Sequence, residues 1–144
     1  MIAELPAQVT TGVHYCRGNI GDKYLARGAL DPVAEQVFGQ LRYDQLLIEW
    51  SDPERHGGFG ALRYVPAGTT VVLGIVNTKS RTVETEDELL RRIEDASRFL
   101  DIDQLALSPQ CGFSSAVGMS DATDVQWRKV DALCQVAQRV WDGR

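Results

Sequence analysis

The sequence predicts an α/β fold made of four consecutive strand–helix units. Short apolar stretches of strand character alternate with segments of helical periodicity along the chain. Polar side chains with metal-binding chemistry stand at the ends of three of the four stretches, where parallel α/β folds carry their functional groups. Strands joined through helices form parallel sheets by right-handed crossovers. We therefore expect one parallel sheet, in a single domain that covers residues 1–144.

The first unit begins with a strand over Gln8–Cys16. Because alternate residues of a strand share a face, one face carries a row that ends in a histidine and a cysteine: Thr10, Gly12, His14 and Cys16. A polar stretch follows, and then a helix over Asp31–Leu41 with Pro32 in its first turn, a position that proline favours.

The second unit has a nearly all-apolar strand over Gln45–Trp50, as expected where both faces are covered. Glu49 is its only charged residue. A loop rich in turn residues, 52–58, leads to a weak helical segment over Phe59–Tyr64. We expect His56, in that glycine-containing loop, to lie at the surface.

The third strand is expected over Thr69–Asn77 and its helix over Glu86–Leu100, where Thr85 and Glu88 are spaced as a capping box. The fourth strand is expected over Gln104–Ser108. The last helix, Thr123–Trp141, carries a predicted buried stripe that includes a small core cysteine: Trp127, Val130, Leu133, Cys134, Ala137, Val140 and Trp141.

Composition excludes several classes of protein. A net charge of −5 without a basic cluster argues against nucleic-acid binding. No segment approaches membrane-spanning length, and the first residues lack the pattern of a signal peptide, so we expect a cytoplasmic protein. The three cysteines are widely spaced and odd in number, which favours free thiols or metal ligands over disulfides.

Four residues form a candidate zinc site: His14, Cys16, Glu49 and Cys111. One imidazole, two thiolates and one carboxylate make a zinc-type ligand set. An ionised carboxylate is costly to bury without a cation. A metal would satisfy Glu49, but an arginine would also do so, and Arg17, Arg55 and Arg63 are available. A histidine and cysteine that merely pack on a strand are the alternative for His14 and Cys16.

Four segments together resemble one family. They are the segments at 14–19 (HYCRGN), 47–50 (LIEW), 74–79 (GIVNTK) and 107–113 (LSPQCGF). In these the chain resembles the catalytic domain of cobalamin-independent methionine synthases and their shorter relatives, including the epoxyalkane:coenzyme M transferases. The resemblance runs from about Val9 to the end and corresponds to strands five to eight of a (β/α)8 TIM-type barrel.

The resemblance implies the same four zinc ligands and a Zn²⁺-dependent methyl or alkyl transferase of methionine biosynthesis. The zinc of that family activates a thiol, homocysteine or coenzyme M, for attack on an alkyl donor such as methyltetrahydrofolate. Arg17, Asn19, Ser108 and Gln110 are candidate substrate-binding residues because they flank the ligands. We expect Lys79 and Arg81 to be solvated loop charges.

Nothing in the sequence matches the first four strands of that barrel. We therefore expect a homo-oligomer or a complementary half-barrel chain, because a half-barrel leaves two sheet edges unpaired. One alternative is a non-catalytic zinc-binding half-barrel that serves as a subunit or fragment. Another is a metal-free barrel of the uroporphyrinogen decarboxylase type, which would leave the ligand set unexplained.

Overall fold

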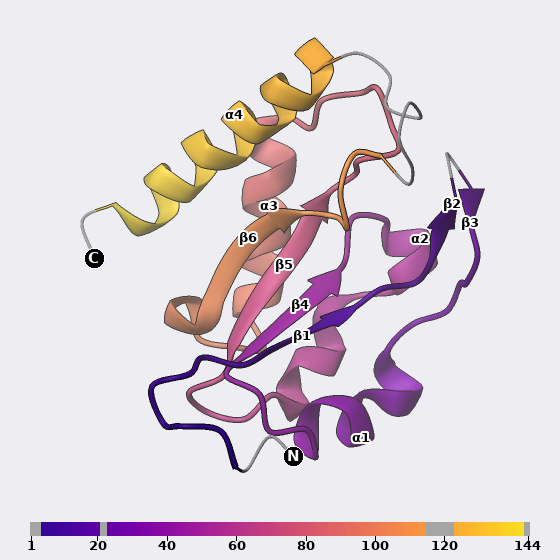
Figure 1. Ribbon diagram of the computed structural model, residues 1–144. Coiled ribbons are helices and arrows are strands. Elements are labelled where there is room, and N and C mark those ends of the chain that lie inside the picture. Colours follow the sequence, from indigo (N-terminus) through magenta and orange to yellow (C-terminus); the bar gives the residue numbers. More distant parts are fainter. Residues whose placement is uncertain (1–3, 21–22, 115–122, 143–144) are drawn as a thin grey trace.

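A four-stranded parallel sheet organises the chain, whose computed structural model describes residues 4–20, 23–114 and 123–142. The strands are β1 (Gly12–Tyr15), β4 (Gln45–Glu49), β5 (Thr70–Val76) and β6 (Leu105–Pro109). They lie side by side in chain order, every neighbouring pair is parallel, and helical segments connect them (Figure 1). The predicted α/β fold of half-barrel type is confirmed.

A small antiparallel pair lies outside this sheet. Strands β2 (Asn19–Ile20) and β3 (Lys23–Tyr24) follow β1 where the sequence indicated only a polar stretch. Two-residue strands are too short to produce a periodic pattern, so the sequence does not predict them.

The helical segments follow the predicted order with shifted ends. A 3₁₀ turn over Asp31–Val33 leads into α1 (Ala34–Gly39), and the segment Phe59–Tyr64 is 3₁₀ rather than α-helical. The loop before it contains one short helix, α2 (Pro53–His56). The longer helices are α3 (Glu86–Ser97), with the predicted capping box at its start, and α4 (Thr123–Trp141), and a 3₁₀ turn over Ile102–Gln104 precedes β6. None of the described helices is long and apolar enough to cross a membrane.

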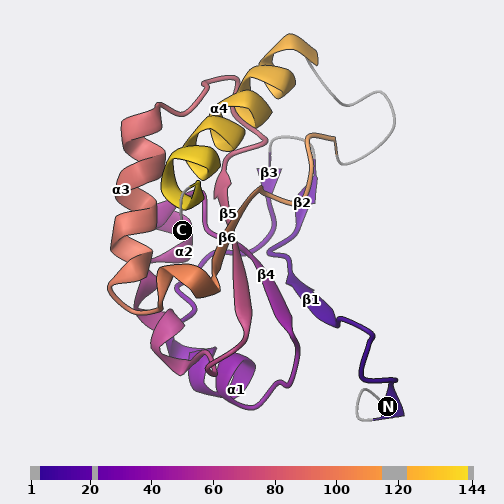
Figure 2. The same ribbon diagram turned by 90° about the vertical axis from the view of Figure 1, so that its left-hand side faces the viewer.

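The core lies between one face of the sheet and helices α1, α3 and α4 (Figure 2). Alternate residues of β4 and β5 face the helices and form the sheet's part of the core. They are buried and include Leu46, Ile48, Val71, Leu73 and Ile75. The helices contribute Ala34, Phe38, Leu89, Ile93, Ala96, Leu133 and Val136. The strands, including their carboxyl ends, are therefore held in place by a packed core on one face of the sheet.

Two predictions about α4 were wrong. Cys134 is exposed, and 64% of the surface of Trp127 is accessible, although both belong to the predicted buried stripe. The buried residues of α4 are Lys129, Leu133 and Val136. The predicted apolar stripe is therefore wider than the face of α4 that packs against the rest of the chain. Cys134 lies instead in an open apolar groove between α4 and β6.

Candidate metal centre

Three of the four strands, β1, β4 and β6, bring the four predicted ligands to one edge of the sheet. His14 lies in β1, Cys16 follows this strand, Glu49 ends β4 and Cys111 follows β6. In the register of the sheet His14 is opposite Leu47, so Glu49 lies two residues further along β4, on the same face. The alternation of the strands thus directs these side chains to the same side.

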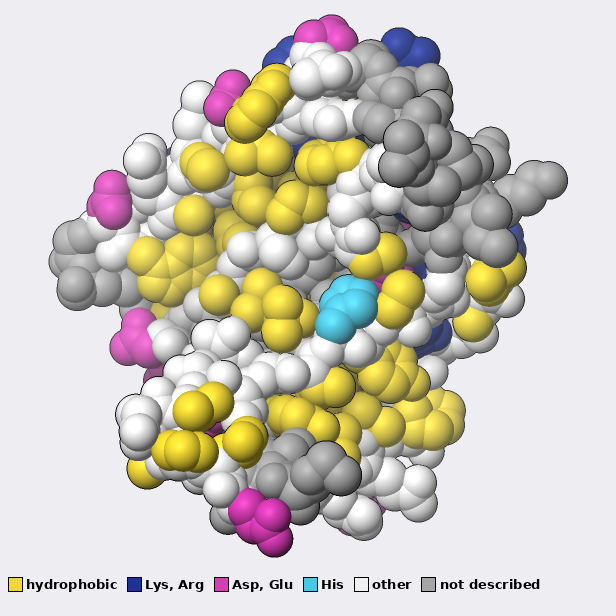
Figure 3. Space-filling view, viewed as in Figure 1, with side chains coloured by type: hydrophobic (Ala, Val, Ile, Leu, Met, Phe, Trp, Pro, Cys, Tyr) yellow, Lys and Arg dark blue, Asp and Glu magenta, His cyan; other side chains and the backbone are white. Residues whose placement is uncertain are grey.

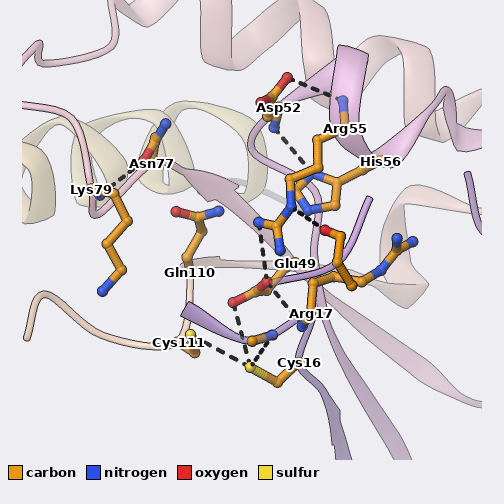
Figure 4. Close-up of polar contacts among 12 residues, drawn as sticks. Cys16, Arg17, Glu49, Asp52, Arg55, His56, Asn77, Lys79, Gln110 and Cys111 are labelled. Atoms are coloured by element: carbon orange, nitrogen blue, oxygen red, sulfur yellow. Dashed lines mark hydrogen bonds and ion pairs between the residues drawn. The ribbon is translucent and has the colours of Figure 1, made fainter. Parts of the chain in front are cut away.

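The donor atoms of the four residues converge. One nitrogen, oxygen or sulfur atom from each lies within 4.8 Å of the other three. Cys16 Sγ is 3.8 Å from Cys111 Sγ and 3.9 Å from Glu49 Oε1 (Figure 4). Two sulfurs bound at about 2.3 Å to a tetrahedral zinc ion are about 3.8 Å apart. The sulfur pair therefore fits a shared zinc ion, and the donor atoms of His14 and Glu49 lie within 4.8 Å of both sulfurs.

Burial differs among the four residues. Glu49 is 1% exposed, whereas His14, Cys16 and Cys111 are exposed. The carboxylate forms the floor of the cluster, and the imidazole and thiols form its open side. An incoming ligand would therefore approach from the side of the softer donors.

Gly74 makes room for the cluster. It pairs with Glu49 on one side and with Ser108 on the other. A Cβ atom at Gly74 would lie 2.9 Å from the Ile48 carbonyl oxygen, closer than side chains normally come to main chain. Gly74 belongs to the lining of a cavity of about 220 Å³, which also includes His14, Glu49, Ser108, Gln110 and Cys111.

The loop that carries Cys111 is fastened to the neighbouring strand. The main chain of Gln110 donates to the Val76 carbonyl oxygen at 3.0 Å, and its side-chain oxygen accepts from Thr78 N at 3.1 Å. Lys79 Nζ donates to the Gly112 carbonyl oxygen at 3.2 Å. Lys79 is thus half-buried and hydrogen-bonded, not the solvated charge that we expected.

The candidate substrate-binding residues lie at different distances from the cluster. Ser108 and Gln110 line the cavity beside it. The guanidinium of Arg17 donates to the Gly28 carbonyl oxygen and lies 5.8 Å from the Tyr15 ring, directed away from the thiols (Figure 4). Asn19 belongs to β2, and its side chain lies outside the described part of the chain.

Main-chain groups after β1 also contact two of the candidate ligands. Arg17 N donates to Glu49 Oε2 at 3.3 Å, and Gly18 N donates to Cys16 Sγ at 3.3 Å. Such N–H groups stabilise an ionised carboxylate and an ionised thiol. The segment that carries the candidate ligands His14 and Cys16 therefore also carries hydrogen-bond donors to Glu49 and Cys16.

Arg55 is the arginine that meets the buried carboxylate. Its Nη1 is 3.8 Å from Glu49 Oε2, and both side chains are almost fully buried. Because Glu49 Oε1 faces Cys16, the two explanations of the buried glutamate, an arginine and a metal, apply to different oxygens.

His56 is buried at 0% exposure, so the prediction of a surface position was wrong. Asp52 caps α2 and donates its main-chain N–H to His56 Nδ1 at 3.2 Å. Burial, together with the positive charges of Arg55 and Arg17, lowers the pKa of His56 from 6.5 to about 4. The signal for α2 was present in the sequence, since Asp52-Pro53 is a typical helix start.

Comparison with known proteins gives one family. Residues 1–133 match the family model described as cobalamin-independent synthase, catalytic domain. The chain is 42% identical over 142 residues to the uncharacterized protein YxjG of Bacillus subtilis (strain 168) and 38% identical to YxjH of the same strain. These alignments cover 97% of this chain but only 37% of each relative.

Two solved structures share the fold. One is described as a putative vitamin-B12 independent methionine synthase from Listeria monocytogenes, with a TM-score of 0.72, 32% identity, and coverage of 97% of this chain and 37% of that one. The other is a B12-independent methionine synthase from Shewanella sp. W3-18-1 in complex with selenomethionine. Its TM-score is 0.74 at 23% identity, and the match covers 96% of this chain and 40% of that one.

Proposed function

This chain belongs to the family of the cobalamin-independent synthase catalytic domain, and we propose that it is the thiol-activating, zinc-binding part of a methyl or alkyl transferase. The convergence of one imidazole, two thiols and one carboxylate at one edge of the sheet carries this proposal. The proposed ligands are His14, Cys16, Glu49 and Cys111. Nitrogen and sulfur dominate this set, which is the preference of zinc.

A zinc ion held here would ionise a bound substrate thiol near neutral pH, at which a free thiol is mostly protonated. Two thiolates and one carboxylate exceed the charge of Zn²⁺ by one, with His14 neutral. The excess negative charge keeps a substrate sulfur nucleophilic. The proposed thiol is homocysteine-like or coenzyme M-like, and the proposed alkyl donor is a methyl folate.

The residues of the cavity would orient the substrate. Gln110 is 6% exposed, and its Nε2 has no hydrogen-bond partner among the described residues. Ser108 lies on the same wall. We propose that both contact the thiol substrate. Arg17 and Asn19, in the segment after β1, are proposed to bind other parts of the same substrate.

Metal analysis of the purified chain tests the zinc site. We expect about one Zn²⁺ per chain in the wild type, and loss of most of it in Cys16→Ser and in Cys111→Ser. Cys134→Ser is the matched control, because Cys134 is an exposed thiol on α4 outside the cluster. Equal zinc in all four proteins, or none in the wild type, would refute the proposal.

A complementary half-barrel is part of the proposal. Strands β1 and β6 are the edges of the four-stranded sheet, and hydrophobic side chains gather over β6 and α4 (Figure 3). Some of these side chains line a groove formed by Leu105, Ala106, Leu107, Leu133, Cys134, Ala137 and Trp141. Exposed edges and apolar patches of this kind invite association. We propose that a second half-barrel segment covers them, in the same polypeptide, in a partner chain or in a second copy.

Two measurements separate the catalytic proposal from a non-catalytic zinc-binding subunit. Sedimentation at micromolar concentration should show association of the chain with itself or with a co-expressed half-barrel, and a compact monomer in both cases would contradict this. A transfer assay with homocysteine and coenzyme M should then show zinc-dependent alkylation in the assembled form. Tight zinc binding without turnover would support the non-catalytic alternative.

A further inference from the structure

The two carboxylate oxygens of Glu49 face different neighbours. Oε1 lies 3.9 Å from Cys16 Sγ, on the side of the sulfur pair. Oε2 accepts a hydrogen bond from Arg17 N at 3.3 Å and lies 3.8 Å from Arg55 Nη1 (Figure 4). One oxygen of the carboxylate therefore faces the thiol of Cys16, and the other faces the guanidinium of Arg55.

Arg55 is fixed independently of Glu49. Its Nε donates to the Ala26 carbonyl oxygen at 2.8 Å, and its own carbonyl oxygen accepts from Gly28 N at 3.0 Å. Its main-chain N–H lies in the capped first turn of α2, where Asp52 accepts it at 3.3 Å. At 2% exposure, the guanidinium is thus a buried charge with a defined position.

We propose that Arg55 is the positioning residue of the metal centre, an inference that rests on the proposed function. It holds the Oε2 side of Glu49, so that Oε1 is the oxygen presented to an ion between the two sulfurs. Partners of metal ligands commonly act in this way.

Cobalt titration of the full chain tests this role. The thiolate charge-transfer and d–d absorption bands of Co²⁺ report ligand identity and geometry, and competition with Zn²⁺ gives zinc affinity. We expect Arg55→Met to weaken the affinity for both ions by about 10- to 100-fold. Arg55→Lys keeps the charge and should lose less. Arg98→Gln is the control, since Arg98 is an exposed arginine whose recorded ion pairs are with Glu94 and Asp95 on α3.

The same substitutions in a Glu49→Gln background distinguish positioning from a general structural effect. If Arg55 acts through Glu49, its replacement by Met or Lys has no further effect on affinity there. An equal loss in both backgrounds, or wild-type affinity and spectra in Arg55→Met, would overturn the inference. If Arg55→Met does not fold, Arg55→Lys gives the same comparison. A wild type that binds neither ion would overturn the proposed function itself, and this inference with it.

Discussion

Replacement of His56 by asparagine should change how the stability of the chain depends on pH. His56 Nδ1 accepts the main-chain N–H of Asp52, so the ring is neutral and carries its proton on Nε2. The side-chain oxygen of asparagine can accept the same hydrogen bond, but it does not titrate. His56→Asn therefore removes the ionisation and keeps the contact.

The magnitude follows from the pKa of His56. Burial and the neighbouring arginines lower it from 6.5 to about 4 in the folded chain. The unfolded chain therefore binds more protons at acid pH, and the free energy of unfolding decreases as the pH falls from 6.5 towards 4. At about 1.4 kcal/mol per pH unit the total effect is about 3 kcal/mol, of which about 2 kcal/mol falls between pH 7.5 and pH 5.

Urea unfolding in the presence of a chelator measures this effect without interference from metal binding. The wild type should lose about 2 kcal/mol more than His56→Asn between pH 7.5 and pH 5. Hydrogen bonds also lower the pKa values of Asp44 and Glu88, but these groups are common to both proteins and cancel in the difference. Parallel pH profiles for the two proteins would refute the assignment of a buried, neutral His56.

Three other changes have expected outcomes. Gly74→Ala should destabilise the chain by about 1 to 3 kcal/mol in urea unfolding, because the new Cβ would lie 2.9 Å from the Ile48 carbonyl oxygen. Gly58→Ala is the control and should change stability by less than about 0.5 kcal/mol, because a Cβ there meets nothing within 4 Å. Equal effects of the two substitutions would contradict the argument. Lys129→Met should cost about 3 kcal/mol, since it leaves Glu84 without the 2.8 Å ion pair of a lysine that is 1% exposed, and Glu84→Gln combined with it should recover part of this in the same assay. A chelator should lower the melting temperature of zinc-loaded chain and release zinc in proportion, and an unchanged melting temperature would argue against a metal that stabilises the fold.

The strands and the longer helices could be predicted because their signals are local. The apolar run of β5 and the helical periodicity of α3 are properties of consecutive residues, and the capping box at Thr85 and Glu88 is a contact between neighbours in sequence. The edge of the sheet that carries the candidate ligands was also predictable, since parallel strands end at a common edge. Their use as zinc ligands stays a prediction.

The surroundings of Glu49 could not be predicted in the same way. The sequence offered three arginines and a metal as partners for this carboxylate. The choice of Arg55 depends on α2, which lies in a glycine-containing loop, and on a main-chain segment near Gly28 that is remote in sequence. The burial of His56 has the same origin.

The sequence by itself determined the order and type of the main elements, the family, and the edge of the sheet at which His14, Cys16, Glu49 and Cys111 stand. The tertiary structure alone decided the orientation of Glu49 between sulfur and guanidinium. It also decided, away from this cluster, that Cys134 lies in an open groove. Periodicity records which face of an element is apolar. Burial depends on what packs against that face, and the residues that pack there come from distant segments of the chain.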